Sequence, residues 1–405
     1  MKALSVILVA FVLLLYGCAS DSSGGGGGDD DSECIVCSAT AECTAALGPG
    51  WACQADCCID MGSDDDADDD SADDDSADDD VADDDSADDD STSSWSAMVS
   101  GTAACLGGVW GSSAADVFAV GVESTGHGTI LHYDGSSWSA MASETTATLS
   151  GVWGSSGSDV FAVGTEYDAD GYPIAGTILH YDGSSWSTMT SVTKMELHGV
   201  WGSSASDVFA VGSKDDSHGS PITDVILRYD GSSWSTTTSW TSACLYDVWG
   251  SSSANVFAVG WNVTSDSGLI LHYDGSAWAA MTSGTRWMLS GVWGSSSSDV
   301  FAVGAKNDFY GEVAAILRYD GSSWSWMASG ATAAQLLDVW GSSAADVFAV
   351  GMDSNTYAGV ILHYDGYSWN AMTSGTMHFL SGVWGSSATD VFAVGQDGTI
   401  LHHGD

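Results

Sequence analysis

One sequence unit is repeated seven times over the last three quarters of the chain. Each copy reads approximately GVWGSSxxDVFAVG, then a variable stretch, then GTILHYDGSSWSxM. The period is 43 to 48 residues, and each unit contains four short apolar runs separated by Gly, Ser and Asp turn signals. Such a period with four predicted strands per unit is typical of a β-propeller blade. The Trp of the VW pair marks the copies at Trp110, Trp153, Trp201, Trp249, Trp293, Trp340 and Trp384.

The two ends of the repeat region predict how the ring closes. The seventh copy stops at residues 402–405 without an SSW strand, whereas a spare SSWSAM occupies residues 93–98, before the first copy. We therefore expect the N-terminal strand to complete the last blade, which leaves no unpaired strand edge between the first and last blades. The predicted fold class is all-β: a seven-bladed β-propeller of four-stranded blades over residues 93–405.

The chain is strongly acidic, with a formal net charge of −48 at pH 7. Residues 1–92 hold 26 of the 55 acidic residues and one of the seven Lys and Arg, which leaves 29 acids against six bases in the repeat region. Nucleic-acid binding depends on Lys and Arg that neutralise phosphates. This composition therefore excludes nucleic acid as a partner, and we expect the protein to be a monomer.

The N-terminus has the pattern of an export signal. Lys2 precedes an apolar run at residues 4–16, which is shorter than the roughly 20 residues that span a bilayer. The run ends in LYGC, which resembles a bacterial lipobox. That resemblance implies a signal peptide at 1–17, a lipid on Cys18, and an exported protein anchored by its lipid alone, in the outer membrane and facing the periplasm or the outside. The alternative is ordinary cleavage after Ala19.

Two segments of distinct composition follow Cys18. Residues 18–33 are a tether of Gly, Ser and Asp, and residues 34–60 contain six Cys. In an exported chain, an even number of closely spaced Cys predicts a small domain held by disulfides. A zinc knuckle is the alternative, but the compartment is oxidising and no His lies nearby. The disulfide candidates are Cys34, Cys37, Cys43, Cys53, Cys57 and Cys58.

Residues 61–92 form an Asp-rich linker of DDDSA-like repeats. A segment of this kind cannot bury apolar surface and repels itself, so we expect a disordered, extended spacer. Calcium loops of the EF type need a Gly for the turn, and residues 64–90 contain none. Loose association of Ca²⁺ with the linker is the one cofactor role that remains open; we expect no other cofactor and no metal site.

A basic residue recurs on the third strand of every copy. Because His and Arg exchange at this position, hydrogen bonding explains it better than metal binding. We expect each to pair with the Asp that opens the second strand, such as Asp116. The seven residues are His132, His180, Arg228, His272, Arg318, His363 and His402.

The unit resembles kelch repeats and, more loosely, the repeats of Asp-box and photosystem-assembly propellers. The shared features are a strand that ends in AVG, a YD on the next strand and a Trp that opens the outer strand. The resemblance spans residues 93–405 and implies the propeller fold. In kelch-like propellers, the face with the longer loops typically holds the partner.

Two sets of loops differ between the copies. These are the loops between the second and third strands and the crossovers from each outer strand to the next inner strand. Loops on a rigid scaffold are common carriers of binding, and Trp and Arg are enriched at binding hot spots. The alternative is that these loops vary without a function. The predicted ligand-binding residues are Lys194, Lys214, Trp240, Trp261, Arg286, Trp287, Lys306, Tyr310, His378 and Phe379.

Two acids interrupt the repeat on the inner strand. Asp247 and Asp338 replace the Gly that precedes VW in the other copies. We interpret them as solvated channel residues, although they are candidates for a cation site or a carboxylate pair. No recognised catalytic motif appears. We predict a non-enzymatic binding module for a protein or glycan of the cell envelope. The alternatives are a secreted carbohydrate-active hydrolase or lyase and a purely structural spacer, with no catalytic residues assigned.

Overall fold

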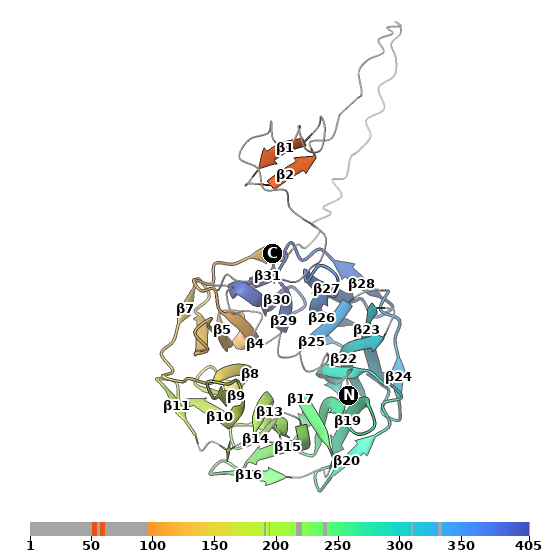
Figure 1. Cartoon of the computed structure of the whole chain (residues 1–405). Helices are drawn as coiled ribbons and strands as arrows, with labels where there is room; N and C mark the ends of the chain where they lie inside the picture. The colour runs from red at the N-terminus through yellow and green to blue at the C-terminus, as the bar shows by residue number, and fades with distance from the viewer. Residues whose placement is uncertain are drawn as a thin grey trace, which may run out of the picture. The chain divides into compact units, whose positions relative to one another are not determined.

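A computed structural model describes the strands of the repeat region in detail. It covers residues 51–54, 57–60 and 95–404, apart from 190–191, 194, 216–220, 238–240, 309–310 and 331–333. Residues 95–404 form seven four-stranded antiparallel sheets arranged as blades in a ring (Figure 1). The predicted all-β propeller with seven blades is confirmed.

The blades follow one another along the chain, each built from its inner strand outwards. Blade 1 contains β4 (Cys105–Ser113), β5 (Asp116–Val122), β6 (Gly128–Tyr133) and β7 (Trp138–Ala140). Blade 2 contains β8 (Thr148–Ser156), β9 (Asp159–Tyr167), β10 (Pro173–Tyr181) and β11 (Trp186–Thr188), and β12 (Val192–Thr193) also pairs with β10. Blade 3 contains β13 (Glu196–Ser204), β14 (Asp207–Asp215), β15 (Pro221–Tyr229) and β16 (Trp234–Thr237).

The next three blades repeat this arrangement. Blade 4 contains β17 (Ala243–Ser252), β18 (Asn255–Asn262), β19 (Ser267–Tyr273) and β20 (Trp278–Met281). Blade 5 contains β21 (Met288–Ser296), β22 (Asp299–Asp308), β23 (Gly311–Tyr319) and β24 (Trp324–Trp326). Blade 6 contains β25 (Ala334–Ser343), β26 (Asp346–Asp353), β27 (Gly359–Tyr364) and β28 (Trp369–Met372).

Blade 7 joins the two ends of the repeat region. Its first three strands are β29 (Leu380–Ser387), β30 (Asp390–Gly395) and β31 (Ile400–Gly404). The fourth is β3 (Trp95–Ala97), which pairs antiparallel with β31 and places Trp95 opposite His403. The predicted closure by the N-terminal strand is therefore confirmed.

Two further elements complete the described part of the chain. A short 3-10 helix, η1 (Gln396–Gly398), occupies the loop between β30 and β31. In a compact unit separate from the propeller, β1 (Trp51–Gln54) pairs with β2 (Cys57–Asp60), and Cys53 lies opposite Cys58. No helix in the described ranges is long and apolar enough to cross a membrane.

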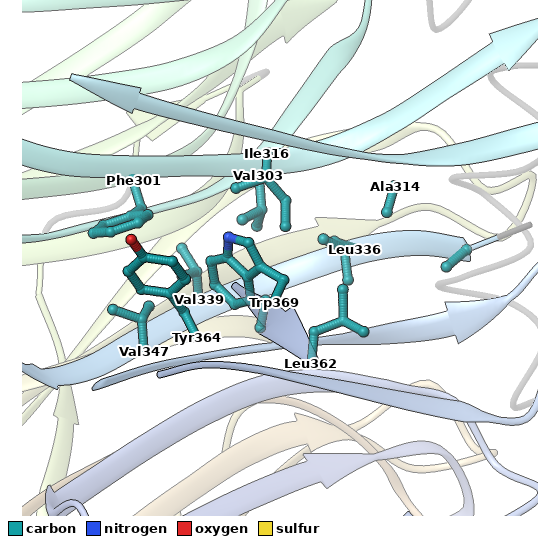
Figure 2. Close-up of a cluster of buried hydrophobic side chains, with 12 residues drawn as sticks. Phe301, Val303, Ala314, Ile316, Leu336, Val339, Val347, Leu362, Tyr364 and Trp369 are labelled. Carbon is teal, nitrogen blue, oxygen red and sulfur yellow. The ribbon is translucent and has the colours of Figure 1, made fainter. Parts of the chain in front are cut away.

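The apolar core lies between the blades rather than inside any one of them. Seven clusters of buried side chains each join two neighbouring blades, including one cluster between blades 7 and 1. Figure 2 shows the cluster between blades 5 and 6, where Phe301, Val303 and Ile316 face Leu336 and Trp369. Since each sheet is covered on both faces, the middle strands are continuous apolar runs such as DVFAV rather than alternating ones.

The repeated VWG sequence forms the joint between inner strands. The Trp ring of one blade lies against the Gly of the next blade. A Cβ placed on Gly154 would come within 2.6 Å of Cη2 of Trp110, and one on Gly111 within 2.6 Å of Cη2 of Trp384. Only Gly leaves room for this approach. The contact recurs around the whole ring and explains why both residues repeat in every copy.

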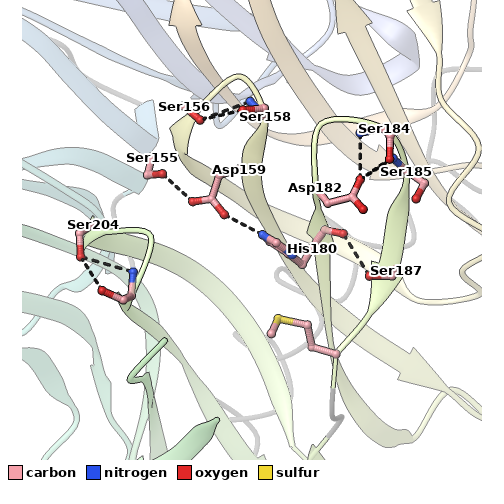
Figure 3. Close-up of polar contacts among 12 residues, drawn as sticks. Ser155, Ser156, Ser158, Asp159, His180, Asp182, Ser184, Ser185, Ser187 and Ser204 are labelled. Carbon is pink, nitrogen blue, oxygen red and sulfur yellow. Dashed lines mark hydrogen bonds and ion pairs between the residues drawn. The ribbon is translucent and has the colours of Figure 1, made fainter. Parts of the chain in front are cut away.

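The basic residue of the third strand pairs with an Asp in six blades. In blade 2, His180 Nε2 lies 2.7 Å from Oδ1 of Asp159, and Ser155 donates to the other carboxylate oxygen at 2.5 Å (Figure 3). Arg228 and Arg318 make the same pairs through Nε at 2.7 and 2.6 Å. The predicted structural role is confirmed. The Asp lies between the Ser and the basic group, so this is not the order of a catalytic triad.

Blade 4 lacks this pair because Asn255 stands where the other blades have Asp. Both Nε2 of His272 and Oδ1 of Asn255 are buried without a hydrogen-bond partner among the described residues. Burial lowers the pKa of His272, and the charge of Asp274 partly opposes that effect. The unpaired groups identify a local loss of stability.

Asn255→Asp is expected to raise the free energy of unfolding by about 1 kcal/mol, or the melting temperature by roughly 1–3 °C. The new carboxylate would raise the pKa of His272. The gain in the free energy of unfolding is therefore largest below the ordinary His pKa of about 6.5. It declines as the pH rises through the raised pKa of His272 in the variant. Thermal unfolding at pH 6 and pH 8 measures both effects. The control is Asp159→Asn in blade 2, which should destabilise; equal stability of both variants and the parent would contradict this role.

Candidate binding site

One end of the propeller carries all the variable loops. Because neighbouring strands are antiparallel, the first residues of the inner strands, the loops between second and third strands and the crossovers lie at the same end. We call this end the loop face. The constant GSSxxD and YDGSSW turns lie at the opposite end, as the sequence predicts.

A central pocket of about 210 Å³ lies at the loop-face end of the inner strands. Its wall includes the first residues of β4 and β8, such as Cys105 and Thr148, and the crossover residue Phe379. It also contains residues from the inner strands of the other blades. The pocket is therefore enclosed by the ring as a whole rather than by one blade.

A single position on each inner strand supplies the most varied part of this wall. A β-bulge interrupts every inner strand between its Leu and the residue before VW. Bulges re-aim a side chain locally, and all seven bulge residues line the pocket. We call them the bulge ring: Gly107, Ser150, His198, Tyr246, Ser290, Leu337 and Ser381.

Asp247 and Asp338, each directly after a bulge residue, also line the pocket. Asp247 accepts a hydrogen bond from the N–H of Val248 at 2.8 Å and one from Val292 of the next blade at 2.8 Å. Asp338 does the same with Val339 at 2.8 Å and Val383 at 2.9 Å. Both acids therefore line the channel, as the sequence interpretation has it, but each is also a half-buried bridge that is fixed between two blades.

Burial controls the ionisation of both acids. Burial and then the charge of Asp338 raise the pKa of Asp247 to about 8, although two backbone N–H groups oppose the shift. Burial likewise raises the pKa of Asp338 to about 6. The two carboxyl groups interact, so a second negative charge in the pocket forms only at higher pH.

The third blade adds a second pair of buried titratable groups. Burial lowers the pKa of His198 to about 4, so its ring is neutral at pH 7. Its Nε2 lies 3.7 Å from Oε2 of Glu196, and its ring lies 5.7 Å from that of Tyr246. Burial raises the pKa of Glu196, and hydrogen bonds from Tyr167 and Ser213 oppose this. Asp247 and Asp338 therefore carry the charge of the pocket wall.

The predicted ligand-binding residues are spread over the loop face. Arg286 is exposed and lines an open hollow of about 330 Å³ on blade 4. Trp287 is half-buried, with its ring 4.0 Å from that of Trp326 in an edge-to-face arrangement. Trp326 is 44% exposed and was not among the predicted residues. This aromatic pair and Arg286 form a second candidate contact region on the loop face.

The other predicted residues do not form one cluster. Lys214 and Trp261 are half-buried on β14 and β18. His378 places Nε2 3.9 Å from Asp397. Phe379 is only 6% exposed and packs with Cys105, Val122 and Met352, so it is part of the core at the pocket wall rather than an exposed aromatic.

Several predicted residues lie outside the part of the chain that the structure describes. Lys194, Trp240, Tyr310, Cys18, Cys34, Cys37 and Cys43 lie outside the described residues, as does the Asp-rich linker. Lys306 lies on β22, and Cys53, Cys57 and Cys58 lie on β1 and β2, but their side chains are not described. The lipid anchor, the disulfides and the loose association with Ca²⁺ stay predictions.

Sequence reasoning missed the bulge ring, although the sequence contains its signal. In the alignment of the seven copies, the position before Gly-Val-Trp or Asp-Val-Trp reads G, S, H, Y, S, L, S. Its neighbours are nearly constant. An aligned position that varies within an otherwise constant strand indicates a side chain that makes different contacts in each blade.

The described part of the chain holds no group of three or more His, Cys, Asp and Glu side chains that is suited to a metal ion. The site therefore consists of the central pocket, with two acids and a varied ring, and the adjacent loops. This arrangement suits the binding of a ligand that enters from the loop face, because the loops surround the pocket entrance.

Comparisons with known proteins identify the fold. No protein-family model and no curated protein matches the chain. The solved structure of YCF48 bound to D1 peptide is 16% identical, with a TM-score of 0.55, and covers 77% of this chain and 97% of that chain. The GH74 xyloglucanase from Xanthomonas campestris is 11% identical, with a TM-score of 0.57, and covers 76% of this chain and 53% of that one. Streptogramin B lyase is 10% identical, with a TM-score of 0.57 and coverages of 76% and 96%.

These similarities establish a propeller fold and no particular activity, because the matches include binding proteins and enzymes alike. The closer resemblance to kelch and Asp-box repeats stays a prediction from the sequence.

Proposed function

We propose that this chain is a non-enzymatic binding module that holds a segment of another protein at the loop face of its propeller. The bulge ring carries the proposal: seven equivalent positions hold five different residue types in an otherwise repeated scaffold. An architectural role would select the same residue in every blade, as it does for the Trp of VW. Variation at positions that line a pocket supports a ligand without sevenfold symmetry.

The shape of the pocket favours a protein segment over a large glycan. A cavity of about 210 Å³ with polar and apolar walls accommodates a side chain or a chain end, while the surrounding loops contact the rest of the segment. YCF48, which shares the fold, is solved with a bound peptide. That observation supports the proposal by analogy only.

The proposal includes export and a membrane anchor. Lipidation of Cys18 would attach the chain to a membrane, and the Asp-rich linker would hold the propeller away from its surface. At no more than ~3.6 Å per residue, a fully extended linker over residues 64–90 would reach on the order of 90 Å. An anchored propeller at this distance would reach a partner in the cell envelope.

The second candidate is a carbohydrate-active hydrolase or lyase, favoured by the two pocket carboxyls and by the enzymes that share the fold. Hydrolysis of a glycoside needs one carboxylic acid and one carboxylate that reach the substrate. Here, each of the four oxygens of Asp247 and Asp338 accepts a backbone N–H. These hydrogen bonds hold both carboxyl groups in place between the blades, which supports a role in holding a ligand.

A peptide array and a glycan array, probed with the purified full chain, test the proposal. We expect peptide capture that Tyr246→Ala weakens at least tenfold. The matched control is Tyr367→Ala, which removes a 95% exposed aromatic from the YDGYSW turn at the opposite end and should leave capture unchanged. Equal capture by the two variants, or capture of glycans alone, would contradict binding of a protein segment at the loop face. Release of sugars from a polysaccharide panel would favour the enzyme.

A further inference from the structure

The central pocket contains two carboxyl groups without a basic partner among the described residues. Asp247 and Asp338 line it, and its wall includes no Lys or Arg among the residues that the structure describes. Neither carboxylate has an ion-pair partner among the described residues. The other titratable groups that face the pocket are His198 and Tyr246, with Glu196 beside His198. None of them supplies a positive charge at neutral pH, since burial lowers the pKa of His198 to about 4.

The backbone fixes both carboxylates but does not neutralise them. Each oxygen of Asp247 and Asp338 accepts one N–H, from its own blade or from the next one. A carboxylate oxygen has two lone pairs. Each oxygen therefore keeps one acceptor site for a ligand while its position is already determined.

A buried hydroxyl between these acids has no partner. Ser290 is the bulge residue of blade 5, between Asp247 on blade 4 and Asp338 on blade 6. It is 8% exposed and lines the same pocket, and its Oγ makes no hydrogen bond with any described residue. Buried polar groups are nearly always hydrogen-bonded. The Oγ of Ser290 has almost no accessible surface, so a change of the Ser290 side-chain rotamer would present this unpartnered hydroxyl to a ligand group in the pocket.

These three groups favour one kind of cation. A primary ammonium group has three N–H donors and a compact charge, and the two carboxylates and the hydroxyl are three acceptor groups. Ca²⁺ requires six to eight oxygen ligands. Guanidinium prefers both oxygens of one carboxylate in a planar fork, whereas here the backbone of two blades already engages the oxygens of each Asp.

We propose that the central pocket binds a primary ammonium group of the protein segment, with Asp247 and Asp338 as its counter-charges and Ser290 as the third acceptor. The ammonium belongs to a Lys side chain or to a chain N-terminus, and the two share this chemistry. This inference rests on the proposed function, because it names the group that anchors the segment.

Small probes test the pocket directly in the full chain. The probes are N-acetyl-lysinamide for the side chain and alaninamide for the chain N-terminus, with N-acetyl-norleucinamide as the uncharged control. Titration calorimetry, at pH 8.5 for N-acetyl-lysinamide and at pH 7 for alaninamide, whose amine has a pKa of about 8, should detect binding of at least one ammonium probe and at least tenfold weaker binding of the norleucine compound. Equal binding of the charged and uncharged probes would overturn the proposal, as would binding of CaCl₂ but of neither amine.

Substitutions that copy the residue of another blade distinguish a loss of binding from a loss of folding. Asp247→Gly and Asp338→Gly install the residue that five blades already have at this position, and Ser290→Gly installs the residue of blade 1. Each Asp variant should weaken ammonium binding at least tenfold, and Ser290→Gly several-fold, with an unchanged circular dichroism spectrum. Unchanged affinity in a folded Asp247→Gly variant would overturn the proposal.

The dependence on pH is a second readout. The affinity for N-acetyl-lysinamide, whose amine stays charged in this range, should rise from pH 6 to pH 8.5 as both carboxyl groups become ionised, and a pH-independent affinity would contradict the assignment. The two proposals fail in different ways. Peptide capture that does not depend on Lys or a free N-terminus would remove the ammonium site and keep the binding module. Binding of amine probes without capture of any peptide would keep the ammonium site and remove the binding module for a protein segment.

Discussion

Trp95→Ala is expected to lower the free energy of unfolding by about 3 kcal/mol, the usual cost of truncating a buried Trp. Trp95 is 9% exposed and opens the three-residue strand that closes the ring. Its ring lies edge-to-face on Phe348 at 6.0 Å and stacks on His403 at 5.2 Å. Because β3 is held by only three residue pairs, Trp95 is its main apolar anchor. Denaturant unfolding followed by fluorescence measures the loss.

The matched controls are Ser96→Ala and Trp138→Ala. Ser96 is exposed on the same strand and should change stability little. Trp138 holds the equivalent position in blade 1, whose four strands are consecutive in the chain. Hydrogen exchange in β31 should accelerate more in Trp95→Ala than in Trp138→Ala, because β3 pairs directly with β31, whereas Trp138 shares an apolar cluster with Ile400 of β31. If Trp95→Ala is as stable as Ser96→Ala, the closing strand does not hold the ring together.

As the pH rises from 5 to 9, the free energy of unfolding is expected to fall much less in the double variant Asp247→Gly, Asp338→Gly than in the parent. In the parent, burial raises the pKa of both acids, to about 8 and about 6, so the folded state retains protons that the unfolded state has released. The free energy of unfolding therefore falls as the pH rises, until both groups are ionised. The two profiles should diverge by an amount on the order of 4 kcal/mol.

Urea unfolding at several pH values gives both profiles. The titration of His198 is common to the two proteins and so cancels in the difference. Asp320→Gly is a suitable control, because hydrogen bonds from Ser322 and then Ser323 lower the pKa of this exposed Asp to about 2, and it does not titrate in this range. Parallel profiles for the parent and the double variant would show that the pocket acids are ordinary solvated carboxylates.

The architecture was predictable because the same strand-forming unit occurs seven times in the sequence. The four apolar runs of each unit became four strands, and the spare SSW segment became the closing strand. The exchange of His and Arg correctly indicated a partner Asp. Even the exception is visible in the sequence, since Asn255 in GSSSAN marks the blade in which the pair is missing.

The pocket was not predictable in the same way, because its geometry depends on register. A strand with regular alternation would place the residues before VW on known faces. The bulge adds one residue and reverses that alternation. His198, Tyr246 and Ser290 therefore line the pocket, which regular alternation along the strand does not predict. Loop aromatics were expected to be exposed, but Phe379 fills a gap between blades 7, 1 and 6. Packing of this kind depends on neighbours that are distant in sequence.

The Trp-over-Gly contact is the same at every joint, including the joint between blades 7 and 1. No joint depends on where the chain starts. The termini could therefore be moved to another blade, as in a circular permutant whose new ends lie beside a different outer strand, with all seven joints kept. In such a permutant, the order of side chains around the pocket is preserved while the linker is attached elsewhere. The position at which the N-terminal segment joins the ring and the chemistry of the central pocket are thus separable properties of this chain.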